Sequence, residues 1–369
     1  MRSYAMAALL AGAAVASPLP QGFDFAAIDA LSPVPTPSIP IVNAAAAQTT
    51  ITFAATEAAS SVSAAVQANP TDTTPKMVKR VDDSSCAVQP AADDTAENFS
   101  SNTAFSDAAN GAVTPDGWTL AYANQAGSSS GIYGYMGYSV MNSYDPAACT
   151  ADCDAIEGCS SHLTNPPPDY ERDPSVDPTS TCTNPPSSTV IKCVYYGGPV
   201  TASSATNDGQ WRYDFHVVIA GSNGYVNNSI ATPTGYSGPV PLGNAAINAP
   251  LDCAGHDTYM GVKIFTSGPF DAGLCAAACS SQSEYNLAHP PSSGEAMTCQ
   301  FFNTYVLYDG SQSVGQYCSL YNETWPASYA TNDGQWRGND HYTIGYSYAF
   351  SNTTGGADEP TTCANAANP

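Results

Sequence analysis

The chain has 369 residues and a formal net charge of −23, with 9 basic and 32 acidic side chains. Residues 1–80 are electrically balanced, so the whole negative excess lies in 81–369. A domain this acidic repels phosphate backbones and anionic lipid surfaces, which argues against nucleic acid or membrane surfaces as partners.

Residues 1–16 have the pattern of a secretory signal peptide. Arg2 is followed by a short apolar run that ends in Ala-Val-Ala, a small-x-small cleavage pattern. The run is too short to span a bilayer, and no later stretch of the sequence is long and apolar enough. We therefore expect a secreted product, extracellular or in the cell wall, without a membrane span.

Residues 17–80 have the composition of a propeptide. They are rich in Ala, Pro and Thr, contain no cysteine and end in the dibasic pair Lys79-Arg80. Basic residues are scarce in this chain, so the pair predicts a processing site for a kexin-like protease of the secretory pathway. We expect 17–80 to be disordered and outside the folded domains, with an Ala-rich patch near 52–68 that favours helix.

All twelve cysteines lie between Cys86 and Cys363. An even number in an exported chain predicts six disulfides rather than a zinc site, so we expect no metal and no cofactor. Four Asn-x-Ser/Thr sequences predict glycosylation, at Asn98, Asn227, Asn322 and Asn352.

One stretch occurs twice. Ala-Thr-Asn-Asp-Gly-Gln-Trp-Arg at 205–212 returns unchanged at 330–337, and 16 of the 35 positions aligned from Cys193 and Cys318 are identical. The chain therefore contains two copies of one unit. Asn227 and Asn352 are equivalent positions of the two copies, so we expect both at the same surface strand end. We place the first unit at 81–227, a Pro- and Gly-containing linker at 228–250 and the second unit at 251–369.

Within the repeat, Asn-Asp-Gly predicts a turn that leads into a strand from Gln210 to about Ile219. Side chains alternate along a strand, so Trp211 and Ile219 share one face while Arg212 and His216 share the other. We expect the Trp face to be buried in both copies and the sheet to be antiparallel with one side covered.

The repeated polar residues have two interpretations. They form a hairpin with a core Trp and a surface Arg, or they form a ligand-binding face. Arg and His four positions apart on a strand lie about 13 Å from each other, too far for a direct acid–base pair. The candidate ligand face consists of Asp208, Arg212 and His216 with the counterparts Asp333, Arg337 and His341.

Three aromatic residues flank the repeat, Tyr196, Tyr321 and Trp325. Their flat rings suit the faces of sugars, and ordinary packing in a β-sheet is the alternative. The acidic group Asp169, Glu171, Asp173 and Asp177 could supply paired carboxylates or bind calcium. We favour a solvated loop because Pro174 interrupts it and the second copy lacks it. No catalytic residues are predicted, since no nucleophile elbow, zinc-binding helix or phosphate-binding loop occurs.

Each copy also predicts a helix that carries two cysteines. Asp145 and Asp271 are candidate N-caps, followed by Cys149-x3-Cys153 and Cys275-x3-Cys279. Cysteines four apart lie on one helical face, so both can be bonded to a sheet beneath the helix.

A helix with Cys-x3-Cys, a third cysteine (Cys159) and a returning cysteine in a strand resembles the PAN/apple module. Together with 171–178 and the repeated hairpin, it resembles fungal secreted proteins with two such units behind a pro-region. The resemblance implies an α+β fold of two tandem disulfide-stapled PAN/apple-like units, each a short helix on an antiparallel β-sheet. It implies the disulfides Cys149–Cys193, Cys153–Cys159, Cys275–Cys318, Cys279–Cys299, Cys253–Cys363 and Cys86–Cys182.

The first copy departs from this pattern in its middle strand. Gln-Phe-Phe-Asn follows Cys299, as a strand start should, but Cys159 is followed by Ser-Ser-His-Leu and three prolines at 166–168. Prolines do not belong in a central strand, which places the middle strand of the first copy in doubt.

The resemblance implies recognition rather than turnover. We expect a secreted binding protein, not an enzyme, that recognises carbohydrate or protein at the fungal cell wall or a host surface. One alternative is an extracellular hydrolase of polysaccharide, which requires paired carboxylates in a cleft. Another is an effector-like structural protein of the wall or of the host contact, in which the acidic surface matters most.

Overall fold

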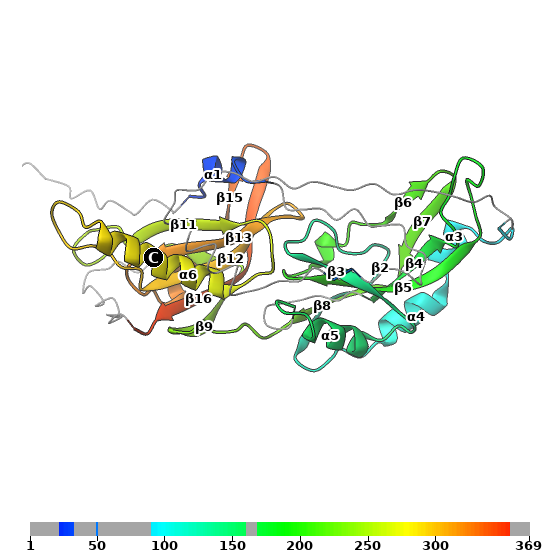
Figure 1. Ribbon diagram of the computed structural model, residues 1–369, viewed down its shortest axis with the longest axis horizontal. Helices are drawn as coiled ribbons and strands as arrows, with labels where there is room; N and C mark the ends of the chain where they lie inside the picture. Colours follow the sequence, from blue (N-terminus) through cyan, green and yellow to red (C-terminus); the bar gives the residue numbers. More distant parts are fainter. Residues whose placement is uncertain (1–21, 33–48, 51–89, 160–167, 355–369) are drawn as a thin grey trace, which may run out of the picture.

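The structure is a computed structural model that describes residues 22–32, 49–50, 90–159 and 168–354. The predicted signal peptide, the processing pair Lys79-Arg80 and the Ala-rich patch lie outside these residues. The described part is an α+β protein with mostly antiparallel sheets and few helices. Figure 1 shows two units of sheet and helix along the long axis, the first in cyan to green and the second in yellow to red.

The first unit is built on one large sheet with the strand order β1-β3-β5-β4-β7-β6. Its strands are β1 (Thr49–Thr50), β3 (Tyr135–Met141), β4 (Pro168–Pro174), β5 (Ser187–Tyr196), β6 (Gly209–Arg212) and β7 (Phe215–Ala220). A separate ribbon pairs β2 (Trp118–Gln125) with β8 (Ser222–Asn227). The helices are α3 (Ala96–Ser100), α4 (Thr103–Gly111), α5 (Pro146–Asp154) and the 3-10 turn η1 (Ala202–Ser204).

The second unit has a sheet of the order β11-β13-β12-β16-β15, with β9 added along β16. Its strands are β9 (Tyr236–Gly243), β11 (Tyr259–Phe265), β12 (Phe301–Asp309), β13 (Gln312–Tyr321), β15 (Gly334–Arg337) and β16 (Asp340–Asn352). A two-stranded ribbon pairs β10 (Ala246–Ile247) with β14 (Ala330–Asn332). The helices are α6 (Ala272–Ala288), the 3-10 turn η2 (Ala327–Tyr329) and α1 (Phe25–Asp29).

The two large sheets repeat each other in order and in register. The order β3-β5-β4-β7-β6 corresponds to β11-β13-β12-β16-β15. Glu171 pairs with Ile219 in the first sheet, and Leu307 pairs with Ile344, 125 positions after Ile219, in the second. The duplication read from the sequence therefore extends to strand pairing.

The two cysteine-bearing helices begin where the sequence predicts. The Asp145 carboxylate accepts hydrogen bonds from the first-turn amides of α5, and the Asp271 carboxylate accepts one from Gly273 in α6. Both helices are bonded to the strands beneath them. The structure contains the disulfides Cys149–Cys193, Cys153–Cys159, Cys275–Cys318 and Cys279–Cys299, in agreement with four of the pairs that the resemblance implies. The pairs of Cys86 and Cys363 lie partly outside the described residues and stay predictions.

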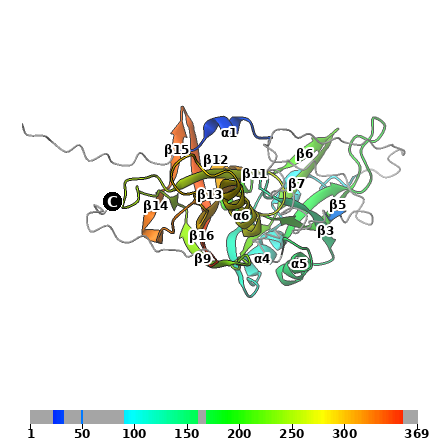
Figure 2. The ribbon, with the colours of Figure 1, turned by 60° about the vertical axis from the view of Figure 1, so that its left-hand side comes forward.

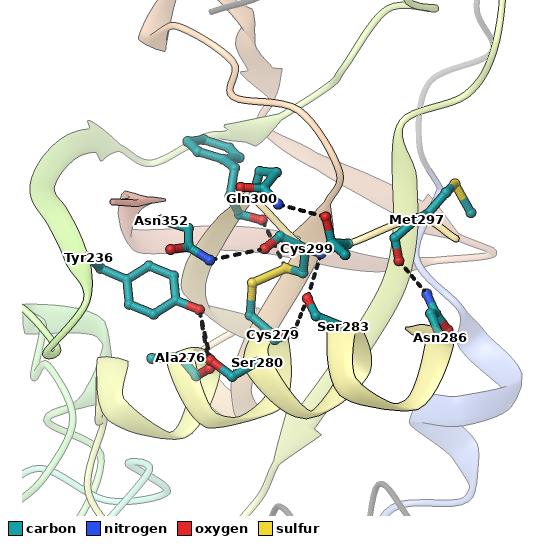
Figure 3. The surroundings of a disulfide bond; sticks show 12 residues. Tyr236, Ala276, Cys279, Ser280, Ser283, Asn286, Met297, Cys299, Gln300 and Asn352 are labelled. Carbon is teal, nitrogen blue, oxygen red and sulfur yellow. Dashed lines mark hydrogen bonds between the residues drawn. A yellow bond between two sulfur atoms is a disulfide. The ribbon is translucent and has the colours of Figure 1, made fainter. Parts of the chain in front are cut away.

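Figure 3 shows how Cys279–Cys299 fastens α6 to the start of β12. The Cys299 amide donates to the Ser283 hydroxyl at 2.7 Å, and the Asn286 side chain donates to the Met297 carbonyl at 2.9 Å. The backbone on the strand side of the disulfide is thus hydrogen-bonded to the helix on the other side, which fixes the helix axis over the sheet.

Each helix covers one face of its sheet with a compact core. In the second unit, buried side chains under α6 include Cys275, Cys279, Phe302, Leu320 and Phe350. In the first unit, Trp118, Met136, Tyr195 and Tyr225 surround the two disulfides of α5. The face of each sheet that is turned away from its helix is therefore the one available for other contacts.

Three expectations about chain organisation are wrong. The predicted linker 228–250 contains β9 and β10, because β9 is an edge strand where Pro239 and Pro241 are tolerated. The middle strand of the first copy exists as β4, with Pro168 and Pro174 at its two ends rather than inside it. Finally, 17–80 is not wholly outside the fold, because α1 packs on the second unit and β1 pairs with β3.

The predicted glycosylation sites differ in accessibility. Asn98 is exposed in α3, whereas Asn322 and Asn352 are half-buried. Asn227 and Asn352 end equivalent strands, as expected, and each side-chain oxygen accepts from the amide two residues on. Asn227 is however only 7% exposed, which corrects the expectation that both lie at the surface.

Candidate functional site

The repeated segment forms a tight hairpin in both units. Asn207 and Asn332 accept through their side-chain oxygens from Gly209 and Gly334, which bends the chain into a four-residue strand. The strand then reverses at 213–214 and at 338–339. The prediction of one strand from 210 to 219 is thus wrong, because the hairpin reversal follows Arg212 and not the Asn-Asp-Gly turn.

The reversal places Trp and His side by side. Trp211 pairs with His216 and Trp336 with His341, as directly opposite residues of the two strands. The ring centroids are 4.2 Å apart in both pairs, and the ring planes are within 6° and 8° of parallel. Trp211 is 66% exposed and Trp336 65%, so the expectation that the Trp face is buried is wrong. Each unit instead presents a flat aromatic surface, which we call the Trp–His platform.

The reversal also separates Arg from His. Arg212 faces the opposite side of its hairpin from His216 and is only 8% exposed, with Nη1 3.9 Å from Asp173 Oδ1. Arg337 is more exposed and binds Asp29 of α1. Asp208 and Asp333 lie at exposed positions of the turns. The predicted ligand face of Asp, Arg and His is therefore not assembled in either unit.

The three flanking aromatic residues are buried. Tyr196 donates to the Ser129 carbonyl, Tyr321 to the Ile247 carbonyl, and Trp325 Nε1 to the Thr258 hydroxyl at 2.9 Å. All three belong to apolar clusters in the interior. Packing in the interior therefore accounts for these residues better than a ligand role, although Tyr196 also lines a pocket of the first unit.

A pocket of about 250 Å³ lies on the helix-free face of the first sheet. Strands β4 and β5 contribute charged residues to its wall, and β3 and the loop at 128–130 contribute tyrosines and serines. The residues that carry its chemistry are Asp169, Glu171, Lys192, Gln210, Tyr135 and Tyr138. The volume suits one small polar group.

Charge is concentrated under this pocket. Lys192 Nζ lies 2.7 Å from Glu171 Oε1 and 3.2 Å from Asp173 Oδ2, and all three side chains are at most 3% exposed. Asp169 is 1% exposed, and its Oδ1 has no hydrogen-bond partner. Three buried carboxylates thus meet two cations, Lys192 and Arg212.

Burial and charge both act on these groups. Desolvation raises the pKa of Asp169 to about 6, against partial compensation from Ser128 and Lys192. Desolvation also raises the pKa of Glu171, although Lys192 opposes the shift. Burial alone would lower the pKa of Lys192, but Glu171 and Asp173 outweigh it and raise the pKa.

The prediction of a solvated loop is wrong for Asp169, Glu171 and Asp173, which are buried, whereas Asp177 is exposed beyond the end of β4. Asp169, Glu171 and Asp173 alternate along β4 and therefore point to one face of a central strand. The alternation Asp-x-Glu-x-Asp was the available signal, and the prolines on both sides concealed it. Within the described residues, no group of three His, Cys, Asp or Glu side chains has the arrangement of a metal site.

No family model, no curated protein and no solved structure matches this chain. The helices of the described segments are all too short or too polar to cross a bilayer. The Trp–His platforms and the first-unit pocket are the features of the described residues that bear on function.

Proposed function

We propose that the protein is a secreted, extracellular binding protein that recognises carbohydrate through its two Trp–His platforms, without catalysis. The observation that carries the proposal is the repetition of an exposed Trp stacked on a His in both units. A single exposed Trp is ordinary on a protein surface. Here both Trp rings are exposed at equivalent positions, and each is stacked on the equivalent His. This repetition favours a contact surface that both units have kept.

The chemistry of the platform suits a sugar. The face of an aromatic ring is negatively polarised, and the axial C–H groups of a pyranose present a flat, weakly positive surface to it. The stacked His fixes the orientation of the Trp ring before any ligand arrives, which lowers the entropy lost on binding. Two platforms in one chain allow simultaneous contact with a repeating polymer.

The units themselves we propose to be PAN/apple-like. Support comes from the helix on an antiparallel sheet and from the disulfide that joins the first cysteine of each helix to a central strand. The signal sequence, the disulfides and the glycosylation sequences support export to the cell wall or the extracellular space.

Pull-down on insoluble chitin, β-glucan and cellulose tests the carbohydrate proposal. The full chain should be retained by at least one polymer, and Trp211→Ala and Trp336→Ala should each weaken retention about tenfold, as expected for loss of one stacked ring. The double variant should fall to background. Tyr285→Ala is the matched control, because Tyr285 also stacks on a histidine, His289, on α6 outside the repeat. Wild-type retention by the double variant, or no retention on any polymer, would refute the proposal.

The pocket of the first unit favours a second candidate, a hydrolase of polysaccharide. Asp169 and Glu171 are paired carboxyl groups with raised pKa values in a hollow, which is the requirement for acid–base chemistry on a glycosidic bond. The candidate predicts release of reducing sugar from a polymer that the platforms retain. Asp169→Asn should abolish this release and leave retention unchanged; an absence of release by the wild-type chain eliminates the candidate.

A further inference from the structure

Part of the predicted propeptide lies on the face of the second sheet opposite α6. Residues 22–32 run across this face, with α1 capped by Asp24, and Figures 1 and 2 both show α1 beside β15. Phe23 and Phe25 pack edge-on against Tyr317 and Tyr342. Ile28 is 8% exposed in the same apolar cluster, so the segment buries aromatic and aliphatic side chains on both partners.

Two side chains of the repeated stretch clamp the segment by polar contacts. The amide of Phe23 donates to Gln335 Oε1 at 2.9 Å. Arg337 donates from both terminal nitrogens to the Asp29 carboxylate, at 2.5 and 2.6 Å, and its guanidinium lies 5.0 Å from the centre of the Phe25 ring. A bidentate pair with a cation–π contact selects a carboxylate at a defined distance from an aromatic ring.

Among the described residues, no helix of the pro-region lies on the corresponding face of the first unit. Strand register equates Asp169, Glu171 and Lys192 of the pocket with Tyr305, Leu307 and Tyr317 of the second unit. This face of the first unit is polar and hollowed, and the loop at 128–130 borders the hollow, whereas the face under residues 22–32 is apolar.

Residues 22–32 have properties that allow them to leave the sheet face of the second unit. The segment precedes Lys79-Arg80, the sole dibasic pair of the sequence, so cleavage there severs its covalent link to the second unit. Its ion pair is solvent-accessible, with side chains of Arg337 and Asp29 that are 41% and 56% exposed. A cavity of about 20 Å³ lies between residues 22–24 and the sheet.

We infer that the outer face of β11, β13, β12, β16 and β15 is a docking groove for a peptide of the pattern Phe-x-Phe-x-x-Ile-Asp. Residues 22–32 are its tethered occupant in the uncleaved chain. Removal of the pro-region frees the groove for a protein segment with two aromatic side chains at alternate positions and a carboxylate four residues after the second. The site is independent of the Trp–His platforms, so failure of the carbohydrate proposal leaves it untouched.

Exchange of a labelled peptide tests the inference on the full chain. A fluorescein-labelled peptide of residues 22–32 is titrated into intact protein and into protein cut at Lys79-Arg80 by a dibasic-specific protease, with anisotropy as the readout. The tethered segment holds a high effective concentration in the intact chain, so the peptide should bind the cut chain at least tenfold more tightly. Gel filtration then shows whether the cut fragment is displaced by a 100-fold excess of unlabelled peptide.

Charge reversal supplies the specificity control. Arg337→Glu in the cut chain should weaken peptide binding at least tenfold, and a peptide with Asp29→Arg should recover most of this loss. Trp336→Ala, a neighbour on the other face of the hairpin, should leave binding unchanged. Equal peptide affinity of intact and cut chains, no effect of Arg337→Glu, or no recovery by the swapped peptide overturns the inference. Unfolding of the cut chain by circular dichroism, or a fragment that never exchanges, also overturns it by making the segment part of the fold.

Discussion

Asp169 illustrates how one buried carboxyl group governs the response of the first unit to pH. Its side chain is 1% exposed, and one oxygen has no hydrogen-bond partner. Lys192, the nearest cation on the facing strand, is already engaged by Glu171 and Asp173. Burial therefore disfavours the charged carboxylate relative to the neutral acid more than water does, which is the physical reason for its raised pKa.

The raised pKa predicts that the first unit loses stability as pH rises. A carboxyl whose pKa goes from 3.8 unfolded to about 6 folded contributes its stabilisation fully below pH 3.8 and loses it as pH rises through 6. The loss is about 3 kcal/mol, and the raised pKa of Glu171 acts in the same direction. Urea unfolding of the full chain between pH 4 and 8 measures it.

Asp169→Asn should remove most of this decline, because the amide does not titrate. Asp208→Asn is the matched control, since Asp208 is exposed and should leave the pH profile unchanged. An equally steep decline in the Asp169 variant would assign the pH dependence to another group.

At the scale of the element, the repeated hairpin depends on one glycine in each copy. Gly209 and Gly334 have φ values of +110° and +140°, a region that other residues rarely adopt. A Cβ at these positions would also collide with the carbonyl oxygens of Val217 and Tyr342 on the facing strand. The sequence Asn-Asp-Gly is therefore needed for a close approach of two strands and not for the hairpin reversal.

Alanine at either glycine should destabilise its unit by about 1–3 kcal/mol, through strained backbone and strand separation. The two variants should have similar melting temperatures because the geometry is repeated. Gly111→Ala, at the end of α4 with open space around it and no positive φ, should be neutral or slightly stabilising. Thermal unfolding followed by circular dichroism measures these differences. An unchanged melting temperature for both hairpin variants would contradict the role of the two glycines.

The same hairpin shows why local sequence rules predict only part of the candidate functional site. A capped helix with two bonded cysteines is predicted from Asp145, Cys149 and Cys153, which are close in the sequence. The structure contains this helix and its disulfide to Cys193. The reversal after Arg212 places Tyr213 at φ +52°, a conformation that propensity assigns to Gly or Asn. Moving the reversal by a few residues inverted the expected faces, so Trp was predicted to be buried and Arg to be exposed.

At the scale of the whole molecule, the sequence predicts that one unit is duplicated. It does not predict how the sheet faces of the two copies differ. Sixteen identical positions out of 35 aligned predict two units, and the matched strand orders agree. The polar pocket of one unit and the covered groove of the other depend on which side chains β4 and β12 bring opposite β5 and β13. Those pairings join residues distant in the sequence, and the docking of 22–32 adds a contact across more than 300 positions.

The two units also share a junction that predicts cooperative unfolding. The Tyr133 hydroxyl donates to the Ser267 carbonyl at 3.0 Å, the Phe270 amide donates to the Gly197 carbonyl at 2.6 Å, and both aromatic side chains are fully buried. A Cβ at Gly197 would collide with Pro269 of the second unit. Gly197→Ala should therefore loosen the junction without backbone strain within the first unit.

We expect the wild-type chain to unfold in one calorimetric transition and the Gly197→Ala variant in two, because the units then lose their stabilising contact before either sheet melts. Tyr133→Phe removes one hydrogen bond and keeps the packing, so it should cost about 1 kcal/mol and retain one transition. Two transitions already in the wild-type chain, or one in the Gly197 variant at an unchanged temperature, would mean that the junction does not couple the units. In that case each sheet, with its helix and disulfides, would be the unit of stability, and the groove of the second unit would respond to cleavage of the pro-region without affecting the first.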